Sequence, residues 1–200
     1  MIYTMSDIHG CYDKYRAMLS EIRFKSTDVL YVLGDVIDRG PDGIKILRDM
    51  SMRPNVFPIL GNHEFTAAMC LPWLTQEITE QSLNSLTDDQ IAALGDWISN
   101  GGETTLQSRW KLKPEERQDI LEYLREMELY AEVEAGGRSF VLTHAALEYF
   151  DPEKPLDAYQ LTDFLFGRPV LEPVCYPDKI LVFGHTPTRP CLKNAAKRSK

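Results

Sequence analysis

All four histidines of this chain lie inside short motifs whose side chains can bind a metal ion or transfer a proton. The motifs are Ser6-Asp7-Ile8-His9-Gly10, Gly61-Asn62-His63-Glu64, Val141-Leu142-Thr143-His144-Ala145 and Gly184-His185-Thr186-Pro187. A fifth motif, Gly34-Asp35-Val36-Ile37-Asp38-Arg39-Gly40, adds two carboxylates and an arginine. No histidine is left for the half-buried structural positions that this residue often fills. The pattern therefore favours a hydrolytic site with a pair of metal ions.

The oxygen and nitrogen donors in these motifs have the spacing that metal coordination requires. Asp7 and His9 are two positions apart, so on an extended segment both side chains point to one side. Asp35 can bridge two ions because a carboxylate has two oxygens. A set of imidazole and oxygen donors without thiolate suits manganese, iron or zinc. We expect the ligands to be Asp7, His9, Asp35, Asn62, His144 and His185.

Three further residues suit the handling of a phosphate group. His63 follows Asn62 directly, so the backbone can aim its imidazole past the metals and toward a leaving oxygen, which a cationic ring can protonate. Such a histidine needs a carboxylate that orients it, and Asp38 is the candidate. Arg39 presents a planar fork that matches two phosphate oxygens.

The elements between the motifs form an alternating pattern of strands and helices. Apolar runs at residues 2–5, 29–33, 56–60, 139–143 and 180–183 read as strands, and each ends at one of the five motifs. Helical apolar spacing follows the first two runs, which predicts a parallel α/β unit. Sites in such sheets form at the carboxyl ends of the strands. Pro58 predicts an edge or bulged position for the third strand, because proline donates no ladder hydrogen bond.

The 200 residues fit a single domain, residues 1–200. Residues 65–128 have helical patterns on both sides of Gly101-Gly102, and we expect them to form an inserted cap. The cap could cover the sheet or shape substrate access, and the pattern does not rank these roles. Residues 193–200 are expected to form a basic tail.

Charge and cysteine content narrow the class of protein. The net charge of −8 argues against broad nucleic-acid binding, which needs a positive face. The cysteines at positions 11, 70, 175 and 191 form no C-x-x-C pair and are expected to be reduced core thiols. No signal peptide is visible, and no apolar run approaches about 20 residues. We therefore expect a cytoplasmic protein without a membrane span; the sequence does not predict its oligomeric state.

Taken together, the five motifs resemble the signature of the calcineurin-like metallophosphoesterases, from the first strand to about residue 190. The resemblance implies a β-sandwich flanked by helices (αββα) with two divalent metal ions at one edge, manganese being expected and iron or zinc being alternatives. It implies that Asp7, His9 and Asp35 bind the first ion and that Asp35, Asn62, His144 and His185 bind the second. It also implies that His63 and Asp38 form the acid pair and that Arg39 binds phosphate. For a second phosphate-binding arginine we choose Arg168, with Arg138 and Arg189 as rivals.

Within that family the chain looks like the serine/threonine phosphoprotein phosphatases, especially the short bacterial and phage type. This implies a phosphomonoester hydrolase that acts on phosphorylated proteins or peptides through a hydroxide held between the metals. A symmetric dinucleoside tetraphosphate hydrolase is the alternative; Asp38 and Glu64 are taken to favour the protein phosphatase. The family continues past Gly-His-Thr with further strands, so we also expect truncated final strands or an open sheet edge, and a non-catalytic phosphate-binding relative is the remaining hypothesis.

Overall fold

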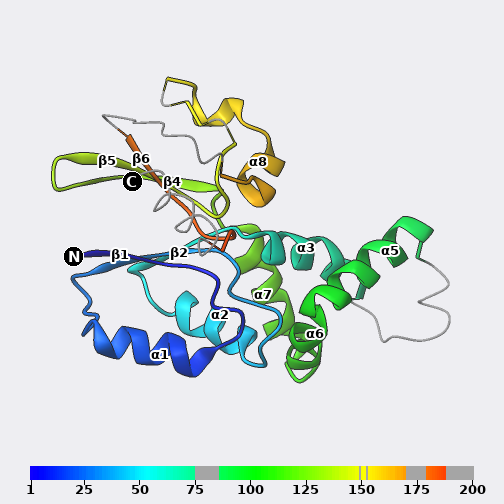
Figure 1. Ribbon diagram of the computed structural model, residues 1–200. Coiled ribbons are helices and arrows are strands. Elements are labelled where there is room, and N and C mark those ends of the chain that lie inside the picture. The colour runs from blue at the N-terminus through cyan, green and yellow to red at the C-terminus, as the bar shows by residue number, and fades with distance from the viewer. Residues whose placement is uncertain (75–85, 149, 152, 170–178, 188–200) are drawn as a thin grey trace, which may run out of the picture.

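Two three-stranded sheets lie face to face in the computed structural model, which describes residues 1–74, 86–148, 150–151, 153–169 and 179–187. The first sheet has the order β1 (Ile2–Met5), β2 (Val29–Leu33), β3 (Val56–Ile59), and all its strands are parallel. The connections are α1 (Tyr12–Glu21) and α2 (Gly43–Ser51), which lie on the outer face of this sheet (Figure 1). The strand–helix pattern of the sequence is therefore confirmed, and β3 is an edge strand of its sheet, as Pro58 predicted.

The second sheet begins with a hairpin. β4 (Tyr130–Ala135) and β5 (Arg138–Thr143) are antiparallel and are joined by Gly136 and Gly137, which have φ values of 58° and 72°. β6 (Lys179–Val182) then pairs in parallel with β5. Leu142 of this sheet packs against Leu33 and Ile59 of the first. The interface between the sheets is thus apolar, as a sandwich requires.

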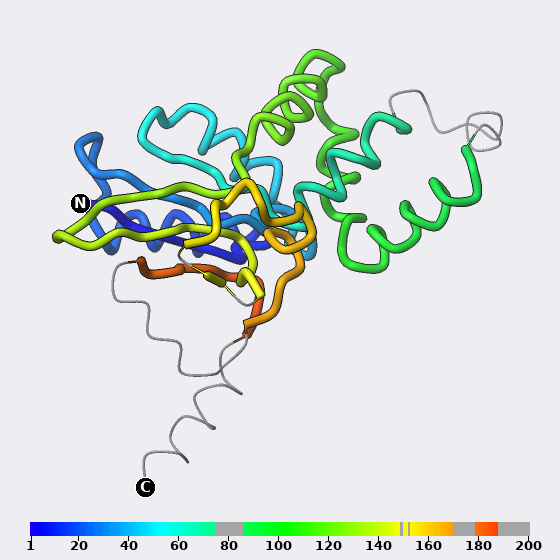
Figure 2. The backbone as a smooth tube through the Cα atoms, turned by 90° about the horizontal axis from the view of Figure 1, so that it is seen from above, coloured from blue at the N-terminus to red at the C-terminus, as the bar shows by residue number. Residues whose placement is uncertain are grey.

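Helical segments cover the outer side of the second sheet. The 3₁₀ turn η3 (Leu156–Ala158) and the helix α8 (Leu161–Phe166) supply Leu156 and Phe164, which pack against Val141 of β5. The layers run helix, sheet, sheet, helix, and Figure 2 shows them from above. The predicted αββα sandwich is confirmed.

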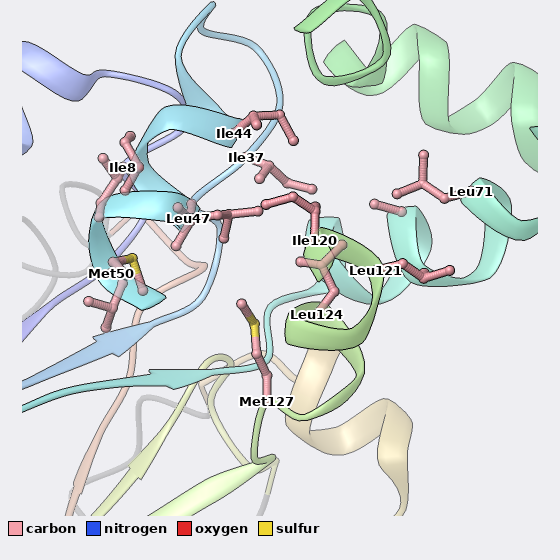
Figure 3. Packing of buried hydrophobic residues seen from close by; sticks show 14 of the residues in the cluster. Ile8, Ile37, Ile44, Leu47, Met50, Leu71, Ile120, Leu121, Leu124 and Met127 are labelled. Carbon is pink, nitrogen blue, oxygen red and sulfur yellow. The ribbon is translucent and has the colours of Figure 1, made fainter. Parts of the chain in front are cut away.

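The helical insert lies beside the sandwich, next to the strand ends. Its described elements are α3 (Asn62–Cys70), η1 (Leu71–Leu74), α5 (Asp88–Trp97), the π turn η2 (Ile98–Gly102), α6 (Glu103–Trp110) and α7 (Pro114–Arg125). Leu121 and Leu124 of α7 pack into the same core as Leu47 and Met50 of α2 (Figure 3). The insert and the first sheet therefore share one apolar core.

Some predictions stay open. The assignment of residues 1–200 to a single domain remains a prediction, and the basic tail at 193–200 lies outside the described residues. Among the described helices, none has the length and apolar character needed to cross a membrane.

Candidate metal centre

The backbone is strained where the predicted site residues stand. Among the described residues, seven that are not glycine have a left-handed φ, and six of these are predicted site residues. The six are Asp7, His9, Asp35, Asp38, Arg39 and His185, with φ between 44° and 66°. This conformation costs about 1–3 kcal/mol per residue and persists only where the surrounding structure enforces it. The clustering of left-handed residues just after the strands indicates a functional site.

The loops after β1 and β2 run side by side and hydrogen-bond each other. The His9 N–H donates to the Asp35 carbonyl at 2.8 Å, and the Gly10 N–H donates to the Val36 carbonyl at 2.8 Å. A Cβ on Gly10 would overlap the backbone of Gly40, so this close approach requires glycine. The two loops thus hold Asp35 close to His9.

Glu64 connects the loop after β2 to the start of α3. Its carboxylate is fully buried and accepts backbone N–H bonds from Asp35 at 2.7 Å, Val36 at 2.8 Å, Ile37 at 3.1 Å and Gly61 at 3.2 Å. Burial, followed by the Asp35 charge, raises the pKa of Glu64 to about 7, while the N–H donors favour its charged form. The sequence analysis missed this role. The signal was the glutamate at the third helical position, as in a capping box.

Two imidazoles are held in the tautomer that a metal ligand needs. His9 donates its Nδ1–H to the Ile37 carbonyl at 3.0 Å, and His144 donates its Nδ1–H to the Leu33 carbonyl at 2.8 Å. Each Nε2 therefore carries no proton and can offer its lone pair to a metal ion. Burial is the largest cause that lowers the pKa of His9 and of His144, and burial followed by His144 lowers the pKa of His185 to about 4. These three rings are neutral at neutral pH, which is the form that binds metal.

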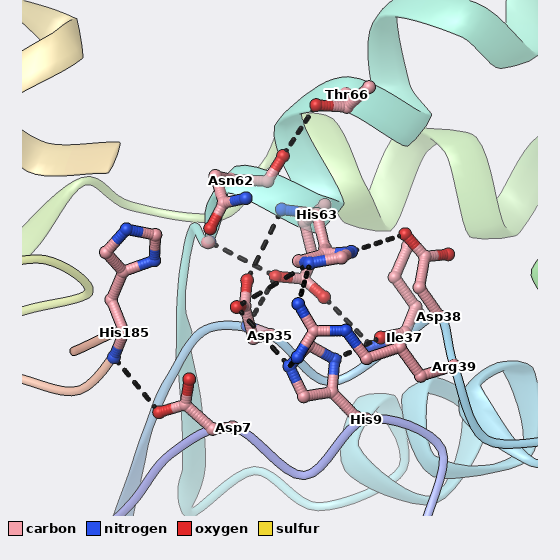
Figure 4. A network of polar contacts seen from close by, with 12 residues as sticks. Asp7, His9, Asp35, Ile37, Asp38, Arg39, Asn62, His63, Thr66 and His185 are labelled. Atoms are coloured by element: carbon pink, nitrogen blue, oxygen red, sulfur yellow. Dashed lines mark hydrogen bonds and ion pairs between the residues drawn. The ribbon is translucent and has the colours of Figure 1, made fainter. Parts of the chain in front are cut away.

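Acceptor atoms converge in two groups that share Asp35. One group is His9, Asp35 and His63, the other is Asp35, His144 and His185, and within each group the ligand atoms lie within 4.8 Å of one another. The His144 Nε2 also lies 3.0 Å from Asn62 Oδ1 and 3.4 Å from Asp35 Oδ1. Figure 4 shows Asp35 beside His9, His63 and Asn62. The buried Nε2 of His185 has no hydrogen-bond partner within the part of the chain that the structure describes. Lone pairs that face each other repel unless a proton donor or a cation lies between them, so this set of nitrogen and oxygen atoms fits divalent metal ions.

Asp7 differs from the expectation in its immediate contacts. It belongs to neither of the two groups, and its Oδ2 accepts from the His185 backbone N–H at 3.1 Å and from the Ser6 hydroxyl. His63 joins the first group because its Nε2 lies 4.0 Å from Asp35 Oδ2. The structure thus brings Asp7 to the edge of the site, and its role as a ligand stays a prediction.

His63 and Asp38 form a buried pair. The His63 Nδ1–H donates to Asp38 Oδ2 at 2.7 Å. Burial alone would lower the pKa of His63, but the hydrogen bond to Asp38 and the charge of Asp35 outweigh it, so the pKa is raised. Asp38 also accepts from Trp97 Nε1 at 2.8 Å and from the Thr105 hydroxyl at 2.5 Å. The sequence analysis missed Trp97 and Thr105, which no motif marks.

Arg39 reaches into the site. Its NH1 donates to His9 Nε2 at 2.7 Å and its NH2 donates to His63 Nε2 at 3.1 Å. Since a cation and this guanidinium cannot share the His9 lone pair, metal binding at His9 requires Arg39 to turn away.

The structure also separates the candidates for a second arginine. Arg168 NH1 donates to the Thr186 hydroxyl at 3.2 Å, directly beside His185. Arg138 stands at the hairpin, at the opposite end of β5 from His144. Arg189 lies outside the described residues. Of the described pair, only Arg168 lies near the site.

Comparison with known proteins adds a family and a set of relatives. A family model described as calcineurin-like phosphoesterase matches residues 1–189. A protein of Wigglesworthia glossinidia brevipalpis is 45% identical over 99 residues, covering 48% of this chain and 36% of that protein. A protein of Acidovorax sp. (strain JS42) is 31% identical over 148 residues, covering 73% of this chain and 44% of that protein. Both are named bis(5'-nucleosyl)-tetraphosphatase, symmetrical; this chain spans less than half the length of either relative.

Among solved structures, a candidate diadenosine tetraphosphatase superposes with a TM-score of 0.61. The match covers 94% of this chain and 76% of that structure at 18% identity. At this level of identity the likeness concerns the fold alone.

The predicted serine/threonine protein phosphatase, with a phosphorylated protein or peptide as its partner, is wrong. The relatives are named bis(5'-nucleosyl)-tetraphosphatase, symmetrical, and that activity was the alternative hypothesis. The physical reason lies in the two residues used to choose. Asp38 orients His63, and Glu64 accepts backbone N–H groups. Neither task depends on which group leaves the phosphorus, so these residues do not distinguish the substrates.

Proposed function

Because the chain belongs to the calcineurin-like phosphoesterase family, we propose that it is a hydrolase that cleaves dinucleoside tetraphosphates symmetrically. Symmetric cleavage of such a substrate releases two nucleoside diphosphates. The observation that carries the choice of substrate is the shared name of the relatives, whose similarity extends over 73% of this chain in one case. The convergence of acceptor atoms around Asp35 supports a hydrolytic centre in that region.

We assign one divalent cation to the side of Asp35 that faces His9 and a second to the side that faces His144 and His185, with manganese as the expected metal. Such ions would withdraw charge from a phosphoryl oxygen and activate water for attack. The proposed ligands are those of the sequence analysis: Asp7, His9, Asp35, Asn62, His144 and His185. The carbonyls of Ile37 and Leu33 keep two of the imidazoles in the required tautomer.

His63 is proposed to donate a proton to the leaving oxygen of a nucleoside diphosphate. Its Nδ1 is occupied by Asp38, so Nε2 is the atom that faces the site and would carry the mobile proton once Arg39, which donates to it in the structure, turns to the phosphate. Asp38 stabilises the cationic ring by accepting its other N–H. The leaving group thereby departs without an additional negative charge.

Arg39 and Arg168 are proposed to bind phosphate oxygens. The Arg39 guanidinium donates to two imidazoles in the structure, and an anionic tetraphosphate is a stronger acceptor for its fork than a neutral ring. Arg168 stands beside Thr186 on the other flank of the site. The two arginine side chains would therefore bind the polyphosphate from opposite sides.

The proposal is tested by product analysis. Purified protein with Mn²⁺ is incubated with diadenosine tetraphosphate and, separately, with a phosphoserine peptide, and products are separated by anion exchange. ADP as the sole nucleotide product, formed faster than phosphate is released from the peptide, supports the proposal. Formation of AMP with ATP, or a preference for the peptide, contradicts it. Hydrolysis of p-nitrophenyl phosphate in the same preparation would exclude the non-catalytic hypothesis.

A further inference from the structure

We infer that the helical insert supplies two positioning residues, Trp97 and Thr105, which hold Asp38 as the hydrogen-bond acceptor of His63. The inference rests on the proposed function for the step that His63 performs. It goes beyond that function because it assigns the helical insert a role in positioning the pair formed by His63 and Asp38.

The contacts of Asp38 account for both of its oxygens. Oδ2 accepts from His63 Nδ1 at 2.7 Å and from Trp97 Nε1 at 2.8 Å. Oδ1 accepts from the Thr105 hydroxyl at 2.5 Å, and the Asp38 backbone N–H donates to the same Thr105 oxygen at 3.0 Å. Asp38 is 0% exposed, so no solvent competes for these positions. The carboxylate has a single orientation in which all donors are satisfied.

The donors around Asp38 take the place of the water that a buried carboxylate has lost. Taking an ionised carboxylate out of water is costly unless hydrogen bonds replace its hydration. Without Trp97 and Thr105, the His63 ring would be its only side-chain donor. The carboxylate would then be free to rotate, and the hydrogen bond that orients His63 would weaken.

The insert also shapes the backbone around Asp38. The Arg39 N–H donates to the Gly101 carbonyl at 3.0 Å. Gly101 has a φ of 103°, and a Cβ there would lie 2.8 Å from Arg39 Cγ. The kink between α5 and α6 therefore packs directly against the loop that contains Asp38 and Arg39. In this loop the two residues have φ values of 66° and 65°.

Simple covering of the sheet does not explain these contacts. Trp97 and Thr105 are each 2% exposed, and covering alone would be served by apolar side chains of the same size. Instead the indole N–H and the hydroxyl both end on one carboxylate that lies 59 and 67 positions away in the chain. Polar groups so deeply buried are retained where their partner needs them.

The test uses variants that each delete one donor. Thr105→Val keeps the side-chain volume, whereas Trp97→Phe also removes part of the ring system. Trp97→Phe removes the indole N–H and Thr105→Val removes the hydroxyl. Thr105→Ser keeps the hydroxyl and serves as the conservative variant. Trp110→Phe, a change of the same type in the same insert, is the matched control, since Trp110 packs on Arg117 rather than on Asp38. Metal content and circular dichroism verify that each variant is folded and loaded.

Two readouts separate positioning from general structural support. The first is the rate on phenyl phosphates of differing leaving-group pKa, because loss of an oriented acid slows poor leaving groups most. We expect Thr105→Val and Trp97→Phe to slow phenyl phosphate by about tenfold or more and dinitrophenyl phosphate by less than about threefold. Thr105→Ser and Trp110→Phe should stay close to wild type on both.

The second readout needs no turnover. The downfield proton NMR signal of the His63 Nδ1–H, identified by its loss in Asp38→Asn, should broaden or disappear in Thr105→Val and persist in Thr105→Ser. An unchanged signal in Thr105→Val, or equal slowing of all leaving groups, would overturn the inference. A protein that fails to cleave diadenosine tetraphosphate still answers this question, so failure of the proposed function is distinguishable. If Trp97→Phe does not fold, the Thr105 series decides alone.

Discussion

Asp35 connects the two candidate ligand groups, because it is the one residue that belongs to both. Its Oδ2 lies 3.6 Å from His9 Nε2, and its Oδ1 lies 3.4 Å from His144 Nε2. Burial raises its pKa to about 6, and a neighbouring cation acts in the opposite direction. Each of the other proposed ligands would serve one ion, so we expect Asp35 to have the largest effect on metal loading of any proposed ligand.

Asp35→Asn should therefore lose metal at both positions. We expect at least about tenfold weaker binding of Mn²⁺, since the amide carries no charge and has a single acceptor oxygen. Elemental analysis after dialysis against a fixed Mn²⁺ concentration measures the change. Asp13→Asn, an exposed carboxylate on α1, is the control and should retain wild-type metal content. Full loading of Asp35→Asn would disprove the shared-ligand assignment.

At the scale of secondary-structure elements, the first turn of a helix can fix the position of a neighbouring loop. The N-terminal glutamates of α3 and α7 occupy equivalent positions, the third residue of each helix. Glu64 is fully buried and accepts four backbone N–H bonds, whereas Glu116 accepts the Lys113 N–H at 3.0 Å near the surface. The same local motif thus holds a site loop in α3, whereas in α7 it caps the helix and its glutamate also pairs with Arg48 NH2 at 3.0 Å.

Glu64→Gln should destabilise the protein far more than Glu116→Gln. The amide offers one acceptor oxygen and turns an NH₂ group toward buried N–H donors, so at least one donor is left without a partner. We expect a loss of about 2–4 kcal/mol for Glu64→Gln and of about 1 kcal/mol or less for Glu116→Gln. Urea unfolding in EDTA measures both without a contribution from metal. Similar losses in the two variants would contradict the role assigned to Glu64.

Helices α1 and α2 are joined by a polar cluster around Asp49. Its carboxylate accepts from the Tyr15 hydroxyl at 2.9 Å, from Arg16 NH1 at 3.1 Å and from Arg53 Nε at 2.7 Å. Burial acts to raise the pKa of Asp49, but the hydrogen bonds from Arg53 and Tyr15 outweigh it, so the pKa is lowered. A carboxyl group whose pKa is lowered by folding stabilises the folded state when it is charged.

The contribution of Asp49 should therefore depend on pH. It is fully present above the unfolded-state pKa of about 4 and is lost as the pH falls through the lower folded-state value. Asp49→Asn should cost about 1–2 kcal/mol at pH 7 and progressively less in acid. Denaturant unfolding at a series of pH values measures the difference from wild type. Asp119→Asn, on the exposed face of α7, is the control; a penalty for Asp49→Asn that stays constant into acid would refute this account.

For the molecule as a whole, the candidate centre joins the two sheets. Asp35 and Asn62 follow strands of the first sheet, whereas His144 and His185 follow strands of the second. The His144 Nδ1–H also donates to Leu33 of the first sheet at 2.8 Å. A cation bound between these residues would add a cross-link to the apolar contacts of the sandwich.

Divalent metal should consequently raise the thermal stability. A ligand that binds only the folded state at one hundred times its Kd adds about 2.7 kcal/mol per site, which corresponds to about 5–10 °C in a protein of this size. Thermal unfolding with Mn²⁺ and after removal by EDTA measures the shift. Asp35→Asn should show little or none of it. An equal shift in that variant would indicate that metal acts elsewhere on the protein.

The sequence alone determined the strand exits and most of the centre. Apolar runs that end at Asp7, Asp35, Asn62 and His144 indicate strands, and parallel strands place their carboxyl ends at one edge of a sheet. The Thr87 start of α5 was also visible, since a threonine followed three residues later by glutamine is a local helix signal. Such features depend on neighbours within a few positions, which is the range over which sequence patterns act.

Only the tertiary structure decided what surrounds those motifs. An indole and a hydroxyl from the insert meet the Asp38 carboxylate, and the Glu64 side chain gathers the loop after β2, because packing brings together segments that are 27 to 67 positions apart. No local period encodes such contacts. The choice of substrate was missed for a related reason: the motifs describe the cleavage of a phosphorus–oxygen bond, while the leaving group is recognised by surfaces that folding assembles.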